Sequence, residues 1–366
     1  MTTESLDFLV ARDDLRRTRW VKSPLADLAE GQARLSVDRF AFTANNVSYA
    51  AFGEMMGYWD FFPAPDGFGR VPVWGFADVA ESRVDGLSAG ERVYGYLPMS
   101  TDLIVSVDKL GPAGFSDASP WRASRAAVYN QYQRCAADPS YAADAEPAQA
   151  LLRPLFMTSF LIDDFLADNA FFGARSVVIS SASSKTSLGL AFVLKRAARA
   201  GLEIIGLTSA GNAAFVAQTG YYDRVVDYRD IGALPVVPAV FVDIAGGATT
   251  RAAVHARFAD ALTHSCAVGG THWEDRGDGG DLPGPPPTMF FAPSQIQKRN
   301  ADWGRGGMER RYAPVWNDYM RSVAGWLEIA ERRGTTGVEA VYAAVINGKA
   351  DARQGLMAAV REAVRA

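Results

Sequence analysis

The residues best suited to bind a ligand are five hydroxyl-bearing side chains and one lysine, in the stretch Ser-Ser-Ala-Ser-Ser-Lys-Thr at residues 180–186. A β-branched run at residues 176–179 precedes this loop, and residues 187–200 have helical composition. A second apolar run follows at residues 203–208, so the pattern predicts a βαβ unit with a right-handed crossover. Because backbone N–H groups and the positive end of the helix dipole would point into the loop, we expect it to bind an anion.

The loop departs from the two glycine-rich patterns that bind phosphate. It lacks G-x-G-x-x-G, because serines fill most of the glycine positions, although Gly189 is placed to let the helix pack close to the sheet. Residues 184–186 are similar to the end of a P-loop, but Ile179 and Ser184 hold its glycine positions, and Asp243 is the only obvious carboxylate for magnesium. We therefore favour a phosphate-binding loop over a P-loop nucleotide-binding protein and over a polar turn without a ligand.

The end of the second predicted strand indicates which dinucleotide to expect. A site that prefers NAD carries an acid there to hold the ribose 2′-hydroxyl, and that acid would repel a 2′-phosphate. Residues 207–212 contain no acid, whereas Thr208, Ser209 and Asn212 can donate hydrogen bonds to a phosphate. The pattern favours NADP as cofactor, and the alternative is that these residues form only a turn and a helix cap.

Composition restricts the class of protein. The 366 residues suggest about two domains, and 49% hydrophobic with 21% charged residues is typical of a globular protein. A net charge of −4 and the lack of a lysine- and arginine-rich run argue against nucleic-acid binding. The polar N-terminus carries no signal-peptide core and no apolar run is long enough to span a membrane, so we expect a cytoplasmic protein with no membrane partner.

Strands are predicted to dominate the first hundred residues, with alternating or β-branched runs at residues 31–43, 71–80 and 91–96. Residues 119–150 differ in composition and are interpreted as an insertion on the surface. Its tyrosines, Tyr129, Tyr132 and Tyr141, could line a substrate pocket or attach the insertion to the core, and we favour attachment.

The rest of the chain alternates helices and strands. Residues 148–169 predict a helix pair or one helix broken at Pro154. Further strands are expected at residues 224–228, 239–245 and 265–269, as in a parallel sheet. Amphipathic helices are expected at residues 321–332 and 338–346 and at the C-terminus.

Several segments, in order, resemble motifs of the medium-chain dehydrogenase/reductase superfamily. Residues 86–95 are similar to its "GxxxGDRV" turn and strand, with Glu91 in place of the aspartate. Residues 220–228 resemble "GAdxvidY", residues 242–247 resemble "vlDxvGg", and residues 338–348 resemble the final helix before "eGkxxGk". The chain is most similar to the zinc-free quinone and enoyl reductase branch, and to a DUF2855-like subfamily within it.

This resemblance implies an α/β fold with a β-rich GroES-like catalytic domain and a Rossmann domain, a doubly wound parallel sheet. The catalytic domain would comprise residues 1–154 and 296–366, and the Rossmann domain residues 155–295. The catalytic cysteine of zinc-dependent relatives is missing, since Asn45 and Asn46 hold its place, and only Cys135 and Cys266 are present, so no metal is expected.

The implied function is NADPH-dependent reduction of an activated C=C or a carbonyl of a small organic substrate. The alternative is a non-reducing NADP-binding or regulatory relative. Tyr58 and Asn46 are the catalytic candidates. Cofactor contacts are expected from Thr158, Ser181, Ser183, Ser184, Lys185, Thr186, Thr208, Ser209, Asn212, Tyr228, Ala245, Gly246, Gly269, Phe290 and Phe291. A homodimer through the edge strand that follows residues 265–268 is also expected, unless the proline-rich loop covers that edge.

Overall fold

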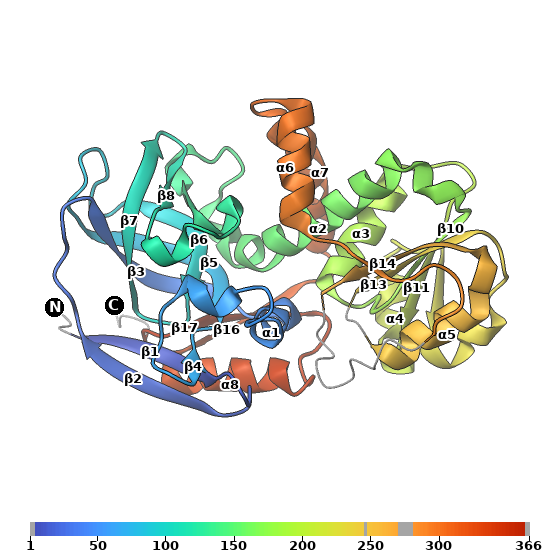
Figure 1. Ribbon diagram of the computed structural model, residues 1–366, viewed down its shortest axis with the longest axis horizontal. Coiled ribbons are helices and arrows are strands. Elements are labelled where there is room, and N and C mark those ends of the chain that lie inside the picture. The colour runs from blue at the N-terminus through green and yellow to red at the C-terminus, as the bar shows by residue number, and fades with distance from the viewer. Residues whose placement is uncertain (1–3, 245–246, 270–280, 363–366) are drawn as a thin grey trace. The chain divides into compact units, whose positions relative to one another are not determined.

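The computed structural model describes residues 4–244, 247–269 and 281–362. The chain divides into two compact units, Met1–Arg153 with Glu328–Ala366, and Pro154–Leu327. Unit 1 is rich in antiparallel strands and unit 2 contains a parallel sheet with helices, which confirms the predicted α/β fold class (Figure 1). Within the described ranges, no helix has the length and apolar character needed to cross a membrane.

Unit 1 contains a closed barrel, because β3 pairs with both β5 and β7. The ring order is β3, β5, β6, β9, β8 and β7, so each strand finds two partners and no edge is left open. Its strands are β3 (Gln32–Ala41), β5 (Pro72–Ser82), β6 (Arg92–Pro98), β7 (Asp102–Gly111), β8 (Gly114–Asp117) and β9 (Gln131–Arg134). A small separate sheet is formed by β1 (Glu4–Ala11), β2 (Thr18–Pro24) and β4 (Phe68–Gly69).

The chain returns to unit 1 as a βαβ unit rather than as two helices. The parallel strands β16 (Glu328–Arg333) and β17 (Gln354–Ala359) are connected through α8 (Gly334–Ile346), and β17 joins β3. The prediction of helices at residues 321–332 and at the C-terminus is therefore wrong where β16 and β17 lie. The short polar run Glu-Ile-Ala-Glu-Arg-Arg carries no clear period, and its acids and arginines make ion pairs within unit 1.

Unit 2 contains a six-stranded parallel sheet in the order β12, β11, β10, β13, β14 and β15. Its strands are β10 (Ser176–Ile179), β11 (Glu203–Thr208), β12 (Arg224–Asp227), β13 (Ala239–Ile244), β14 (Leu262–Val268) and β15 (Thr288–Met289). The helices between them are α3 (Lys185–Arg196), α4 (Ala210–Gln218) and α5 (Ala248–Phe258). Strand order reverses beside β10, and this switch point is where open α/β sheets bind ligands.

Three further helices differ from the prediction. Helix α2 (Glu146–Asp168) continues through Pro154 without a break, since Leu151, Leu152 and Phe156 on either side of the proline are buried. Helices α6 (Ala292–Trp303) and α7 (Gly307–Val323) lie side by side in unit 2 (Figure 1). Residues 296–327 therefore belong with the parallel sheet, not with the β-rich domain as predicted.

Aromatic and ionic contacts explain this difference in domain boundary. Phe156 of α2 stacks on Tyr319 of α7 with ring centroids 4.2 Å apart. Arg299 of α6 is buried and bonds Asp164 of α2 at 2.6 Å. Burying these groups elsewhere would leave a charge unpaired, which is costly.

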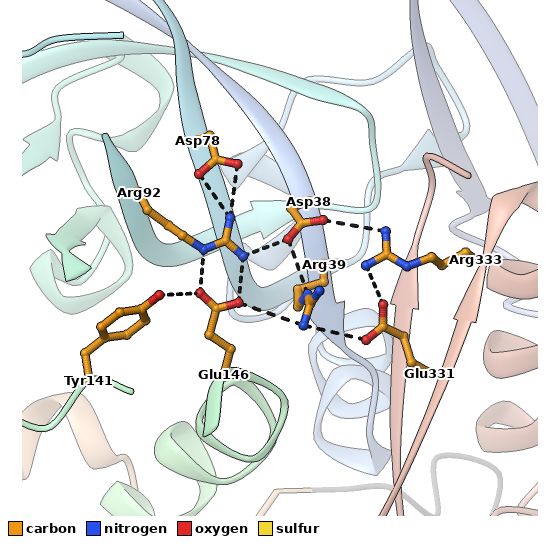
Figure 2. A network of polar contacts seen from close by, with 8 residues as sticks. All are labelled: Asp38, Arg39, Asp78, Arg92, Tyr141, Glu146, Glu331 and Arg333. Atoms are coloured by element: carbon orange, nitrogen blue, oxygen red, sulfur yellow. Dashed lines mark hydrogen bonds and ion pairs between the residues drawn. The ribbon is translucent and has the colours of Figure 1, made fainter. Parts of the chain in front are cut away.

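A network of four acids and three arginines joins the barrel to the start of α2 (Figure 2). Arg92 of β6 bonds Asp38 at 2.7 Å, Asp78 at 3.0 Å and both carboxylate oxygens of Glu146. Glu146 is 4% exposed and also accepts a hydrogen bond of 2.8 Å from Tyr141 of the 119–150 segment. Burial alone would raise the pKa of Asp38, but the hydrogen bond from Arg92 and the positive charges of Arg92, Arg39 and Arg333 together hold that pKa below its ordinary value.

We predict that Glu146→Gln destabilises unit 1. The substitution removes the charge of a nearly buried carboxylate that bonds Arg92 through both oxygens. Arg92 keeps Asp38 and Asp78, so the loss should lie below about 3–5 kcal/mol, the cost of a fully broken buried pair. The midpoint of urea-induced unfolding, measured by fluorescence, should be clearly lower for Glu146→Gln than for the wild type. The control is Asp13→Asn, which breaks an exposed pair with Arg17 and should leave the midpoint unchanged. Equal midpoints for Glu146→Gln and wild type would contradict this account.

Candidate functional site

The serine-rich loop begins with hydroxyls that are used within the protein. Ser184 caps α3: its Oγ accepts from the Ser187 backbone N–H at 3.1 Å and donates to Ser187 Oγ at 2.8 Å. Ser187 Oγ in turn donates to the Ser180 carbonyl at 2.9 Å. The hydroxyl hydrogen of Ser184 is therefore directed at Ser187, and a bond from Ser184 to a ligand stays a prediction.

Ser180 joins the ends of two neighbouring strands. Its Oγ donates to Asp243 Oδ1 at 3.0 Å and accepts from the Ile244 backbone N–H at 2.8 Å. Asp243 is 2% exposed, and its second oxygen accepts from Arg251 Nε at 2.9 Å. Both carboxylate oxygens are thus engaged, so Asp243 is not placed to serve as the magnesium ligand of a P-loop site.

Each of the next three loop residues is held by a side chain from residues 212–228. The Ser181 backbone N–H donates to the Tyr228 hydroxyl at 3.1 Å, and the Tyr222 hydroxyl donates to the Ala182 carbonyl at 3.0 Å. Asn212 Nδ2 donates to Ser183 Oγ at 3.1 Å. Ser181 has φ of 47°, a left-handed conformation that disfavours any residue with a Cβ. These contacts hold the loop in a shape that glycine usually provides.

Donors for a ligand remain after these internal bonds are assigned. The Ser181 side chain, like its backbone N–H, bonds the Tyr228 hydroxyl. Ser183 and Thr186 are half-buried, and their hydroxyl groups can turn toward a ligand. Lys185 is the first residue of α3, where the helix dipole favours an anion. Two hydroxyls and a lysine at a helix N-terminus suit the chemistry of a phosphate.

The other predicted cofactor residues lie at several places. Thr208 ends β11 and is buried, Ser209 precedes α4 and is exposed, and Gly269 follows β14. Thr158 lies on α2 and donates to the Pro154 carbonyl at 3.1 Å. Phe290 and Phe291 follow β15. Ala245 and Gly246 lie outside the described residues.

Contacts bring together only part of the predicted set, namely Ser181, Ser183, Asn212 and Tyr228. The supporting residues Tyr222 and Arg251 were missed in the sequence, because their partners lie 40 and 8 residues away along the chain and no spacing rule connects them. Ser180 belongs to the predicted loop, and its hydroxyl bonds Asp243, 63 residues away. Burial raises the pKa of Tyr228, so its hydroxyl is neutral at physiological pH.

The two catalytic candidates, Tyr58 and Asn46, lie in unit 1. Asn46 belongs to α1 (Ala44–Ala51), where its Oδ1 accepts from the Thr43 backbone N–H at 2.7 Å and its Nδ2 donates to the Pro72 carbonyl at 2.8 Å. These bonds form a capping box and attach α1 to the barrel. Asn46 therefore has a structural task, and Tyr58 is the stronger candidate of the two.

Tyr58 lies in a cluster of aromatic side chains. It starts the short helix η1 (Tyr58–Phe61), and its ring centroid lies 4.7 Å from that of Tyr49. Its hydroxyl lies 3.4 Å from that of Tyr129. Burial raises the pKa of Tyr58, Tyr49 and Tyr129, so all three carry neutral hydroxyl groups at physiological pH.

The other two tyrosines of the 119–150 segment make contacts that attach it. Tyr132 is fully buried, and its hydroxyl donates to the Tyr96 carbonyl at 2.8 Å. Tyr141 donates to Glu146 in the ionic network of Figure 2. Gly95 leaves room for the Tyr132 ring, since a Cβ there would lie 2.5 Å from it.

Among the residues that the structure describes, no three His, Cys, Asp or Glu side chains gather to hold a metal ion. Cys135 and Cys266 are buried free thiols, and burial raises the pKa of each to about 12. His264 stacks on Phe172 with centroids 4.1 Å apart.

Comparison with known proteins places the chain in a family. The model of the family described as "Protein of unknown function (DUF2855)" matches residues 40–351. The chain belongs to this DUF2855 family. No curated protein matches the sequence.

Solved structures show what fold this DUF2855 member has. CurA from Vibrio vulnificus in complex with NADPH is similar with a TM-score of 0.59 at 12% identity, over 98% of this chain and 99% of that chain. The yhdH oxidoreductase from Salmonella enterica in complex with NADP gives 0.54 at 12%, over 97% and 100%. The quinone oxidoreductase from Coxiella burnetii gives 0.52 at 12%, over 98% and 100%. The fold is therefore that of the quinone and enoyl reductases, as the sequence motifs predicted.

Gly189 provides a test of how the loop's helix is seated. A Cβ at this position would lie 2.8 Å from Ser159 Oγ and 3.1 Å from the Phe156 ring. The glycine therefore allows α3 to pack closely against α2, whereas the sequence suggested close packing against the sheet. We predict that Gly189→Ala destabilises unit 2 by about 1–3 kcal/mol, because the helices must separate.

The matched control is Gly211→Ala in α4, where a Cβ meets nothing within 4 Å. Alanine favours helix by up to about 1 kcal/mol, so this variant should be as stable as wild type or more so. Chemical denaturation of both variants makes the comparison. Equal losses from the two substitutions would show that close packing of α2 on α3 does not matter.

Proposed function

We propose that this protein is an NADPH-dependent, metal-free oxidoreductase that reduces an activated C=C or a carbonyl of a small organic substrate. The observation that carries the proposal is the loop at the end of β10. It offers hydroxyl, ammonium and helix N-terminal donors at the switch point of the sheet. Support comes from similar structures, since CurA and yhdH oxidoreductase were solved with NADPH and NADP.

In this proposal the serine loop holds the phosphates. Ser183 and Thr186 donate hydroxyl hydrogens, and Lys185 supplies positive charge, while Ser181 is held by Tyr228. Residues 207–212 carry no acid that would repel a 2′-phosphate, which favours NADPH over NADH. Tyr228 and Asn212 contribute by holding the loop, and Asn212 keeps one amide hydrogen for a ligand.

When bound, NADPH supplies a hydride to the substrate carbon. The substrate oxygen then gains negative charge, which a neutral hydroxyl can stabilise and protonate. Tyr58 is proposed for this task because its raised pKa keeps the proton on the side chain at physiological pH. The amide of Asn46 holds the start of α1 and thereby the segment that leads to Tyr58.

The alternative function is a non-reducing NADP-binding or regulatory protein. The observation that favours this alternative is the serine-rich loop, because it lacks the glycines of the usual dinucleotide-binding fingerprint. The expected homodimer and cytoplasmic location stay predictions. Strand β15 lies at the edge of the parallel sheet, and Met289 on it is 51% exposed, which suits an edge available for pairing.

We predict that Lys185→Ala weakens NADPH binding by about ten- to a hundredfold, because a charge-assisted hydrogen bond is worth about 1.5–3 kcal/mol. Calorimetric titration with NADPH and NADH measures the change. If Lys185 pairs with the pyrophosphate, the affinities for NADPH and NADH should fall together. If it pairs with the 2′-phosphate, the affinity for NADH should fall much less.

Lys195→Ala is the control for this experiment. It removes a lysine from the other end of the same helix, where Lys195 pairs with Asp223, and should leave the NADPH affinity unchanged. If the wild-type protein binds neither cofactor at millimolar concentration, the oxidoreductase proposal is wrong.

We predict that Tyr58→Phe lowers kcat by about a hundredfold or more with the best substrate found among enones, quinones and aldehydes. The dissociation constant for NADPH should stay the same, because the substitution removes one hydroxyl group and leaves every donor of the serine loop in place. NADPH oxidation and calorimetry provide the two measurements. A wild-type kcat in this variant would remove Tyr58 from the mechanism.

A further inference from the structure

The 119–150 segment brings a hydroxyl group to Tyr58. Tyr129 lies on the short helix η3 (Ala127–Asn130), and its hydroxyl lies 3.4 Å from the Tyr58 hydroxyl. The two rings meet edge to face, with centroids 5.9 Å apart at 85°. Either hydroxyl can be the donor, and both are nearly excluded from solvent.

Tyr49 makes the arrangement a cluster of three hydroxyls. Its ring lies 4.7 Å from that of Tyr58 and 6.3 Å from that of Tyr129. Its hydroxyl accepts from Trp74 Nε1 at 3.4 Å and interacts with the Tyr129 hydroxyl. Because the Tyr49 oxygen already accepts from an indole, its own hydrogen is available to another oxygen.

We propose that Tyr129 is a positioning residue for Tyr58, and that it stabilises the phenolate formed when Tyr58 gives its proton to the substrate. This inference rests on the proposed function of Tyr58. It assigns a role in the reaction to the 119–150 segment, whose tyrosines otherwise only attach it to the barrel.

The proton transfer from Tyr58 needs no reactant besides the substrate and water. The O–H bond of Tyr58 breaks, and its proton bonds to the substrate oxygen that has gained an electron pair. The phenolate then accepts a hydrogen bond from the Tyr129 hydroxyl, and regains a proton from water after the product leaves. A hydrogen bond to the charged form of a group lowers its pKa, so Tyr129 makes Tyr58 a stronger acid than burial alone would allow.

The charged groups around this cluster are paired and should not titrate in its place. Arg122 is buried, contacts Asp117 at 3.1 Å and lies 5.7 Å from the centre of the Phe61 ring. On the other side, Arg125 pairs with Asp60 of η1. Among the described residues, Tyr96 and Tyr94 are further titratable neighbours, and burial raises the pKa of each above its ordinary value. The Tyr58 titration should therefore respond to Tyr129 more than to these charges.

The test is the ionisation of Tyr58 followed by NMR of protein labelled with 13C at the tyrosine ζ carbon. The spectrum of Tyr58→Phe assigns the Tyr58 signal. In Tyr129→Phe the Tyr58 signal should move at neutral pH, because its hydrogen-bond partner is gone. Its titration midpoint should also rise by about 0.5–1 pH unit, the equivalent of one hydrogen bond. Tyr141→Phe is the control, since it removes another hydroxyl of the same segment and should leave the Tyr58 signal in place.

An unchanged Tyr58 signal at neutral pH in Tyr129→Phe would overturn the inference, even if alkaline unfolding prevents a full titration. A movement as large in Tyr141→Phe would overturn it too, because the cause would be a general shift of the segment. Neither measurement needs NADPH or turnover. Failure of the proposed function would appear in cofactor binding, and failure of this inference would appear in the Tyr58 signal.

Discussion

The hydrogen bonds that hold residues 181–183 are the constraint on which the proposed cofactor site depends. A loop of serines lacks the conformational freedom of glycine, and Ser181 in the left-handed region costs about 1–2 kcal/mol. The bonds from Tyr222, Tyr228 and Asn212 offset that cost, since each contributes about 1 kcal/mol. Side chains from the neighbouring crossover thus replace the backbone property that glycine supplies in the usual fingerprint.

This replacement changes what the loop can offer a ligand. Glycine lets a phosphate approach the backbone closely, whereas a serine-rich loop adds hydroxyl donors. The structure divides those hydroxyls into two groups. Ser180, Ser181 and Ser184 use their hydroxyls within the protein, while those of Ser183 and Thr186 can turn toward a ligand. The sequence alone treats all five as equivalent, because composition does not indicate which hydroxyl is already engaged.

The fold was predictable from the sequence where a period or a motif was strong. The βαβ unit at residues 176–208 and the barrel strands β3, β5 and β6 follow from β-branched and alternating runs. Strands β7 and β8 were not predicted, and β9 makes part of the 119–150 segment a barrel strand, not a surface insertion. Prediction failed at β16 and β17, which are short strands of mixed polarity, and at Pro154, where a buried apolar face keeps α2 continuous. The site was predictable in part: the loop itself is local in sequence, but Tyr222 and Asp243 reach it only through the folded sheet.

Electrostatics at the carboxyl edge of the sheet supports the same site. Two acids end strands there, Asp243 on β13 and Asp227 on β12, and an unpaired carboxylate at either place would repel a phosphate. Each is paired with an arginine that follows it in the chain. Arg251 bonds Asp243 at 2.9 Å, and Arg229 bonds Asp227 at 2.8 Å. The hydrogen bond from Arg229 also holds the pKa of Asp227 below its ordinary value. Pairing with arginine thus removes the repulsion that Asp243 and Asp227 would exert on an anion, and the N-terminus of α3 favours an anion at the loop although the whole chain carries −4.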